Sequence, residues 1–147
     1  MYKCLLLTTP SANLQEEGPT VEVQFLIPRQ IEERYRKENK AIPAPVSIKA
    51  LIDTGATNCV VRQDIPIALG LQPIDIIGIN TPSTKNHRAY RYFIRMVIPS
   101  AKITYGGLFT ALPLDGQNIS SLIGRDLLAF GILIYTGNAN QFTLSLL

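Results

Sequence analysis

The chain has 147 residues, 46% of them hydrophobic, with ten Pro, ten Gly, two Cys and a formal net charge of +3. This length suits one domain, residues 1–147, and the apolar content excludes an intrinsically disordered chain. No apolar run approaches the roughly 18 residues that a membrane-spanning helix needs. Two cysteines are too few for a disulfide framework, which favours a cytoplasmic location.

Residue usage also narrows the chemistry. A single His excludes a His-rich metal centre and disfavours a Ser/His or Cys/His nucleophile, and no Gly-rich phosphate loop is present. Neither a metal nor a cofactor is therefore expected. Many short apolar runs separated by Pro and Gly favour an all-β fold.

Short apolar runs predict the strands of the first half of the chain. Alternation of Val21, Val23, Phe25 and Ile27 with polar residues is typical of a half-buried strand. We expect strands at residues 2–8, 21–27 and 46–52, and a loop at residues 10–19. Asp64 is predicted to cap a short turn of helix that ends at Gly70.

Residues 29–40 form a charged, helix-prone insertion between two of these strands. Ile31 and Tyr35 are four residues apart, so they share one side of a helix. We expect a short surface helix or an ordered loop. A partner-binding or substrate-gating element is one interpretation, and a solvated insertion is the favoured one.

The second half of the chain contains the clearest strand. Residues 87–98 alternate, with Tyr90, Tyr92, Ile94, Met96 and Ile98 on one face. With the extended residues 71–80 before it and a polar turn between, this strand predicts a β-hairpin. Further expected elements are a bend at residues 105–107, a strand at 108–114, a helix at 125–130, and a second hairpin from strands at 132–135 and 141–147. The last strand is apolar and is expected to add to a partner's sheet edge.

One carboxylate stands between two apolar segments. Leu51-Ile52 precede Asp53, and Cys59-Val60-Val61 follow, which predicts a strand-turn-strand hairpin with Asp53 at its tip. Gly55 supplies backbone freedom for the turn. A desolvated ionised Asp needs a donor, a charge partner or a shared proton. An ordinary Asx turn is the alternative interpretation.

A related pattern occurs downstream. Leu122-Ile123-Gly124 repeats the arrangement of an apolar pair running into a glycine bend, and Arg125-Asp126 open the short helix. Together the Asp-Thr-Gly-Ala and Leu-Ile-Gly-Arg-Asp segments resemble the retropepsin family, the retroviral-type aspartic proteases and their soluble bacterial relatives. The resemblance covers residues 46–147. It implies a closed acid-protease β-barrel with a flap hairpin and one short C-terminal helix.

The resemblance assigns roles to particular residues. It implies that Asp53 is catalytic, that Thr54, Gly55 and Ala56 form the active-site loop, and that Gly124, Arg125 and Asp126 support the site. The tip of the flap over the substrate would be Thr81, Pro82, Ser83, Thr84, Lys85 and Asn86. The sequence departs from the family pattern at two places. The flap tip lacks glycine, and Thr57 stands where the family has the Asp that pairs with the arginine.

Peptide hydrolysis by carboxylates needs two of them sharing a proton, and the chain has one Asp-Thr-Gly. Two copies on a twofold axis resolve this stoichiometry. We therefore expect a homodimeric aspartic endopeptidase that cleaves extended polypeptides by general acid/base attack of water, with Asp53 from each subunit. A catalytically silent, dimeric peptide-binding module of the same fold is the alternative.

The basic residues suggest a third hypothesis. Residues 76–114 contain no Asp or Glu but include Lys85, Arg88, Arg91, Arg95 and Lys102. A nucleic-acid binder is one explanation, but no nucleic-acid fold signature accompanies these charges, so a solvated basic sheet face is favoured. For a protease, the same charges would favour acidic side chains at outer substrate positions.

Overall fold

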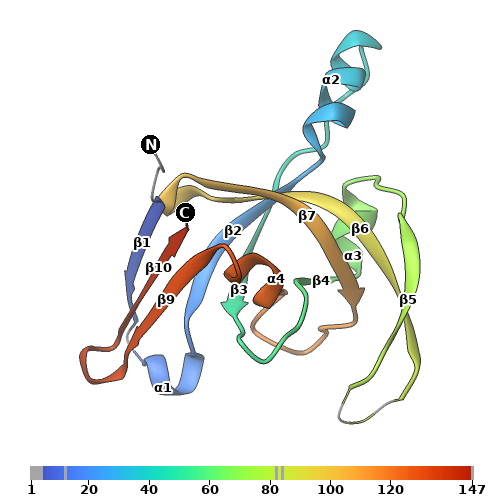
Figure 1. Ribbon diagram of the computed structural model, residues 1–147. Helices are drawn as coiled ribbons and strands as arrows, with labels where there is room; N and C mark the ends of the chain where they lie inside the picture. Colours follow the sequence, from blue (N-terminus) through green and yellow to red (C-terminus); the bar gives the residue numbers. More distant parts are fainter. Residues whose placement is uncertain (1–4, 12, 82, 84, 147) are drawn as a thin grey trace.

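The computed structural model describes residues 5–11, 13–81, 83 and 85–146. Strands dominate this part of the chain, with short helices between them (Figure 1). The strands are β1 (Leu5–Pro10), β2 (Thr20–Leu26), β3 (Val46–Ile52), β4 (Val60–Arg62), β5 (Asp75–Ile79), β6 (His87–Ile98), β7 (Ile103–Leu112), β8 (Ser121–Ile123), β9 (Gly131–Thr136) and β10 (Gln141–Leu146). The helices are α1 (Leu14–Glu17), α2 (Arg29–Lys37), α3 (Asp64–Ala68) and α4 (Arg125–Leu128).

Six strands form a closed barrel. The larger sheet has the order β2-β3-β8-β4-β7-β6-β5, and β2 also pairs with β6, which closes the ring and leaves β5 outside it. The β3–β8 and β4–β7 pairings are parallel, and the others in this sheet are antiparallel. Closure pairs both edges of each of the six barrel strands, and exposed edges are what invite unwanted pairing. The all-β barrel predicted from the sequence is confirmed.

Alternation along the strands fills the barrel. In β2, Val21, Val23 and Phe25 are buried, as the sequence pattern predicted. The ring of Phe25 meets that of Phe109 from β7 edge-on, with 5.2 Å between the centroids. In β6 the predicted alternation holds from Tyr92 onward, but Tyr90 is exposed. The reason is that β7 pairs with β6 only from residue 91, so Tyr90 lies beyond the barrel wall.

A second, smaller sheet has the order β1-β10-β9 among the described residues. The final strand β10 lies in its centre, with both edges paired. The expectation that this strand adds to a partner's edge is therefore wrong. The edges of this sheet belong to β1 and β9.

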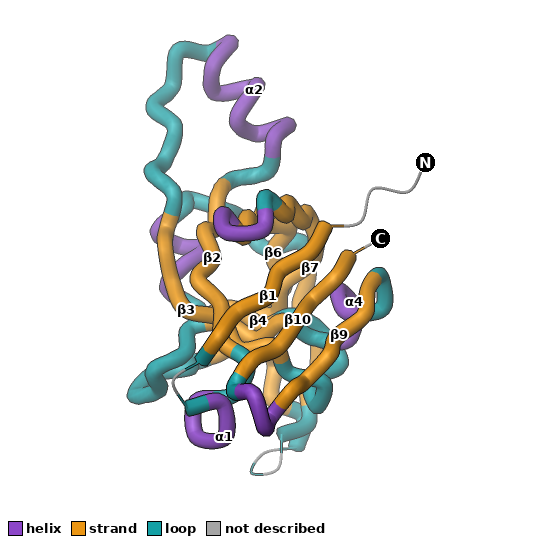
Figure 2. Tube along the Cα trace, turned by 90° about the vertical axis from the view of Figure 1, so that its left-hand side faces the viewer, coloured by secondary structure: helices purple, strands orange, loops and turns teal. Residues whose placement is uncertain are grey.

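The predicted surface helix is confirmed as α2, which stands away from the barrel (Figure 2). Ile31 and Tyr35 are partly buried and pack against the core, as their spacing suggested. Glu32 of α2 pairs with Arg36 and with Arg95 from β6. None of the helices in the described ranges combines the length and hydropathy required to cross a membrane.

Three local predictions are wrong. The expected loop at residues 10–19 contains α1, because the side chain of Asn13 accepts a hydrogen bond from the Glu16 amide and caps this helix. Asp64 is the first residue of α3 rather than its cap, because the backbone of Gln63 before it is already helical, and the Asp64 carboxylate pairs with Arg62. The chain does not bend at residues 105–107, which continue β7.

Glycine explains the error in β7. The turn before this strand is a 3-10 segment at Pro99–Ala101, followed by Lys102 in the left-handed region with φ 54°. A Cβ on Gly107 would collide with the Tyr105 side chain, and one on Gly106 would lie 3.5 Å from the Phe93 ring. Gly107 thus makes room for the Tyr105 ring on a strand, a role that strand glycines also take, whereas a Cβ on Gly106 would be in ordinary contact with Phe93.

Candidate functional site

The carboxylate motif and the downstream motif lie side by side. The predicted hairpin at Asp53 is wrong, because β8 lies between β3 and β4. Ile52 aligns with Ile123 in the parallel β3–β8 pair, while Val60 aligns with Leu122 in the antiparallel β4–β8 pair. The two apolar pairs that repeat in the sequence are therefore neighbours in register, and the residues that follow them converge at one end of the barrel.

Asp53 begins the turn after β3. Its amide donates to the carbonyl of Ile123 at 3.0 Å, which extends the β3–β8 ladder by one residue. Its carboxylate Oδ1 accepts a hydrogen bond from the Gly55 amide at 2.8 Å. Asp53 is half-buried, whereas Thr54 and Gly55 are exposed. A Cβ on Gly55 would lie 3.0 Å from this oxygen, so glycine leaves room for the carboxylate.

A second carboxylate, that of Asp126, holds the loop that follows Asp53. Asp126 of α4 accepts hydrogen bonds from the Cys59 amide at 2.9 Å, the Cys59 thiol at 3.0 Å and the Leu127 amide at 2.9 Å. Burial, reinforced by the hydrogen bond to Asp126, raises the pKa of the Cys59 thiol to about 12. The thiol therefore keeps its proton near neutral pH and serves as a donor.

Gly124 fits tightly under the same loop. Its amide donates to the Cys59 sulfur at 3.3 Å. A Cβ at this position would lie 2.5 Å from the carbonyl carbon and oxygen of Asn58, closer than real Cβ contacts come. Backbone packs directly on backbone here, so only glycine fits without movement.

Arg125 spans the loop from one side to the other. Its amide donates to the Ala56 carbonyl at 2.9 Å, Nη1 donates to the Thr54 carbonyl at 2.7 Å, and Nη2 donates to the Thr57 hydroxyl at 3.1 Å. A carbonyl and a hydroxyl thus take the place of the carboxylate that the family pattern provides. Arg125 remains exposed, so these bonds hold the loop at the protein surface.

The hairpin predicted as the flap consists of β5 and β6, which pair from Asp75↔Arg91 to Ile79↔His87. It reaches toward the same end of the barrel as the Asp53 turn (Figure 1). At the tip, the Thr81 and Ser83 hydroxyls are 3.3 Å apart, and the Asn86 amide donates to Asn80 Oδ1 at 3.0 Å. Lys85 and Asn86 are exposed. Pro82 and Thr84 of the predicted tip lie outside the described residues.

Sequence reasoning missed the part played by Cys59. It was expected only as a buried strand residue, yet its amide and thiol join the strand to α4. Only a weak indication of this role was present in the sequence, namely a small residue with a hydrogen-bonding side chain at the first buried position after a turn. In the described ranges, no group of three or more His, Cys, Asp or Glu side chains could hold a metal ion.

Comparisons with known proteins support the fold. No protein-family model matches this chain, and no curated protein matches it significantly. A crystal structure of a retropepsin-like aspartic protease from Rickettsia conorii aligns with 99% of this chain and 97% of that chain. The TM-score is 0.54 and the sequence identity 17%. At this identity the likeness concerns the fold, and the chain has the retropepsin-like all-β fold predicted from its two motifs.

Proposed function

We propose that this chain is one subunit of a homodimeric aspartic endopeptidase in which Asp53 from each subunit forms the catalytic dyad. The observation that carries the proposal is the state of the Asp53 carboxylate. It stands on an exposed turn of a retropepsin-like barrel and receives one hydrogen bond, from Gly55, within the described part of the chain. Its remaining lone pairs are free to meet a second carboxylate, a water and a substrate.

The second carboxylate has to come from a second chain. Asp64 pairs with Arg62, Asp75 pairs with Arg91, and Asp126 is held by hydrogen bonds from its surroundings. Asp115 is exposed in a turn outside the loop. Two carboxylates about 3 Å apart cannot both ionise and therefore share one proton. A twofold axis that passes beside Asp53 supplies such a pair.

The small sheet offers a surface for the second subunit. Strand β9 follows α4 directly and is an edge strand among the described residues. Phe130, Ile132 and Ile134 are 63%, 54% and 54% exposed, so this edge combines free backbone groups with apolar side chains. Antiparallel pairing of β9 with its copy would join two three-stranded sheets across the twofold axis.

The proposed reaction follows from the shared proton. The ionised member of the dyad accepts a proton from water as the water attacks the scissile carbonyl, while the protonated member donates to the carbonyl oxygen. A proton then passes to the leaving nitrogen as the C–N bond breaks. The pair titrates with macroscopic pKa values that belong to both carboxylates.

The other residues of the site have supporting parts in this proposal. The Thr54 hydroxyl links the two active-site loops across the axis, and Ala56 lines the cleft. An extended substrate lies beneath the flap and adds to it by β-pairing, with alternate side chains in pockets. A cytoplasmic location, expected from the low cysteine count, stays a prediction.

The decisive experiment compares casein cleavage from pH 4 to pH 8 by the wild type and Asp53→Asn, with and without pepstatin. Sedimentation of the same samples gives the oligomeric state. Asp115→Asn is the matched control, because it makes the same chemical change in an exposed turn. We expect acid-favoured cleavage that pepstatin inhibits, that Asp53→Asn abolishes and that Asp115→Asn preserves. A dimer without activity would instead favour the silent peptide-binding module.

A nucleic-acid role is not supported by the surroundings of the basic residues. Arg91 pairs with Asp75, and Arg95 pairs with Glu32 of α2. Two of the five cations in residues 76–114 are therefore matched by carboxylates from outside that segment. The same pairings weaken the expectation that acidic side chains are preferred at outer substrate positions, since only the cations nearer the flap tip and Lys102 are left for that task.

A further inference from the structure

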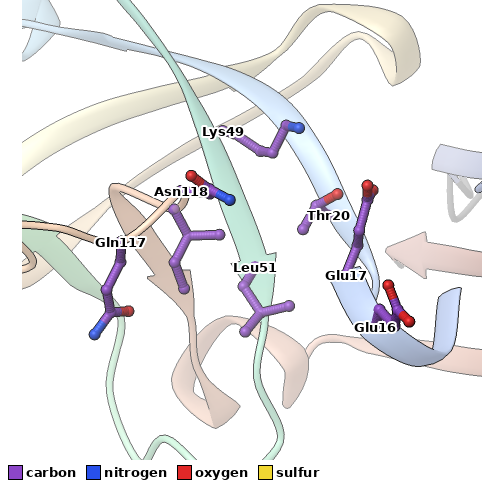
Figure 3. Close-up of a pocket in the computed structure, with 8 residues that line it drawn as sticks. Glu16, Glu17, Thr20, Lys49, Leu51, Gln117 and Asn118 are labelled. Carbon is purple, nitrogen blue, oxygen red and sulfur yellow. The ribbon is translucent and has the colours of Figure 1, made fainter. Parts of the chain in front are cut away.

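A hollow of about 540 Å³ lies on the outer face of β2 and β3. Its floor contains Leu51 and Lys49 of β3 and Thr20 of β2, and Thr20 aligns with Leu51 in the strand register. Glu16 and Glu17 of α1 form one wall, and residues 117–119 form the opposite wall. Figure 3 shows Leu51 in the middle, with the two glutamates on one side and Gln117 on the other.

The strand connects this hollow to Asp53. Side chains alternate along β3, so Lys49, Leu51 and Asp53 share one face while Ala50 and Ile52 point into the barrel, where both are buried. Two residues along a strand span about 6.6 Å. Leu51, which lines the hollow, therefore precedes Asp53 by two strand positions, so the hollow is placed to receive a substrate residue near the scissile bond.

The wall formed by α1 is fixed in place. Leu14 is buried, its amide donates to Asn140 Oδ1 at 3.4 Å, and its carbonyl accepts from the Tyr135 hydroxyl at 3.2 Å. Asn13 caps the helix through the Glu16 amide. The two glutamates that follow Leu14 are thus presented to the hollow from an anchored turn rather than from a free loop.

The charges around the hollow are predominantly negative. Glu16 and Glu17 are exposed, and no ion pair to either is formed within the described residues. The one cation of the lining, Lys49, is the register partner of Glu22 on β2 and forms no ion pair within the described residues, so the lining carries two carboxylates against one ammonium group. A cationic group that enters the hollow would therefore find two carboxylates without ion-pair partners on one wall and the apolar side chain of Leu51 in the floor.

We propose that this hollow is a specificity subsite that accepts a lysine or arginine side chain of the polypeptide substrate. The aliphatic part of the side chain would lie on Leu51, and its charged end would pair with Glu16 and Glu17. This inference rests on the proposed function. Because a twofold dimer contains two copies of the hollow, the preference applies on both sides of the scissile bond.

The first test measures binding rather than cleavage. Fluorescein-labelled extended peptides in three matched sets, carrying Lys, norleucine or Glu at the varied positions, are titrated with Asp53→Asn protein by fluorescence anisotropy. We expect the Lys set to bind about fivefold more tightly than the norleucine set, the size expected of two solvent-exposed ion pairs. The preference should shrink in 1 M NaCl, where the screening length is about 3 Å.

Two variants in the same background identify the source of the preference. Glu16→Gln combined with Glu17→Gln should abolish it, whereas Glu33→Gln, on α2 and outside the hollow, should leave it unchanged. Equal binding of the three sets, no binding of any set, or a Lys preference that survives the double substitution would overturn the subsite.

A cleavage experiment distinguishes a failure of the proposed subsite from a failure of the proposed protease function on which it rests. Wild-type protein digests casein, and mass spectrometry maps the cut sites. Asp53-dependent cleavage without enrichment of Lys and Arg near the cuts would remove the subsite and leave the protease. A Lys preference in binding without any cleavage by the dimer would remove the protease and leave a binding site for basic peptides.

Discussion

Asp53 and Asp126 invite comparison because each follows an apolar pair on neighbouring parallel strands, and both are half-buried. Their surroundings differ. The carboxylate of Asp126 accepts hydrogen bonds from the Cys59 amide, the Cys59 thiol and the Leu127 amide. That of Asp53 accepts one, from the Gly55 amide, among the described residues.

The difference in hydrogen bonding separates Asp126, whose carboxylate holds the structure together, from Asp53, whose carboxylate keeps open acceptor positions. Buried and half-buried polar groups normally find partners, so the full set of donors around Asp126 explains why it can sit beneath the loop. Asp53 lacks such a set, and in the proposed dimer a second copy and a substrate would complete its bonding. The second motif thus holds the loop that follows Asp53, while the first leaves the Asp53 carboxylate on that loop with open acceptor positions, and four changes test this division.

The largest effect on stability is expected from Gly124→Ala. The added methyl would press on the Asn58 carbonyl carbon and oxygen at 2.5 Å, and backbone cannot move aside as a side chain can. We expect a loss of about 2–4 kcal/mol in the free energy of unfolding, measured by urea denaturation.

The matched control is Gly55→Ala, whose methyl would meet the Asp53 carboxylate oxygen at 3.0 Å. We expect it to cost about 1 kcal/mol or less while lowering kcat/KM for casein at least tenfold, because it displaces the carboxylate. Equal destabilisation by the two alanines would show that the packing of Gly124 under the loop is no tighter than the turn at Gly55.

The next effect distinguishes the two carboxylates directly. Asp126→Asn keeps the shape of the side chain but turns an NH₂ group toward surrounding donors, which leaves one of them without an acceptor. We expect a loss of about 1–3 kcal/mol in urea denaturation at pH 7. Asp53→Asn should change stability by less than about 0.5 kcal/mol while abolishing cleavage. A reversed order of the two stabilities would contradict the division of roles.

The reactivity of the Cys59 thiol shows whether its hydrogen bonds with Asp126 and Gly124 stay formed. With its pKa raised to about 12, the thiol should react with iodoacetamide at pH 8 about a thousandfold more slowly than the same thiol in urea. The measurement uses Cys4→Ser protein, so that Cys59 is the only thiol labelled. Labelling at the rate of the unfolded chain would mean that the network opens readily.

The raised pKa of Cys59 also makes the stability of the folded protein depend on pH. The folded pKa of Cys59 lies above its ordinary value of 9.0, so the folded state holds this proton more tightly than the unfolded state. The contribution of the protonated Cys59 thiol to the free energy of unfolding is therefore fully present below pH 9 and is lost as the pH rises from 9 toward 12. Cys59→Ala in the Cys4→Ser background should remove this part of the decline in melting temperature.

Much of this division could be predicted from the sequence. Apolar runs before Asp53 and Gly124 indicated two similar strands, and the resemblance of the two motifs to the retropepsin family implied the barrel that contains them. These signals are local, because alternation and turn residues act over a few positions. Register between distant segments carries no such signal, so the insertion of β8 between β3 and β4 was not foreseen.

Side-chain partners were still harder to predict. Asp126 was expected to support the site, but nothing within its own segment points to Cys59, to which it is joined across the barrel end. Gly106 and Gly107 look like a turn in the sequence but continue a strand, where Gly107 leaves space for the Tyr105 ring. In each case the outcome depends on which side chains the closed barrel brings together.

The smallest effect is expected where this chain departs from the family pattern. Arg125 donates to the Thr57 hydroxyl at 3.1 Å and remains exposed. Thr57→Asp would turn that hydrogen bond into an ion pair and should raise stability by about 0.5 kcal/mol, the usual size for exposed pairs. Thr57→Asn, of the same shape without the charge, is the control.

The pH dependence identifies the origin of that gain. The arginine would lower the pKa of the introduced carboxylate below its unfolded value of about 3.9. The gain of Thr57→Asp over Thr57→Asn should therefore be present at pH 7, disappear as the pH falls through the folded pKa below about 3.9, and shrink in 0.5 M NaCl. A gain that ignores both pH and salt would not come from Arg125, and the loop would then be held mainly by the bonds from Arg125 to the Thr54 and Ala56 carbonyls.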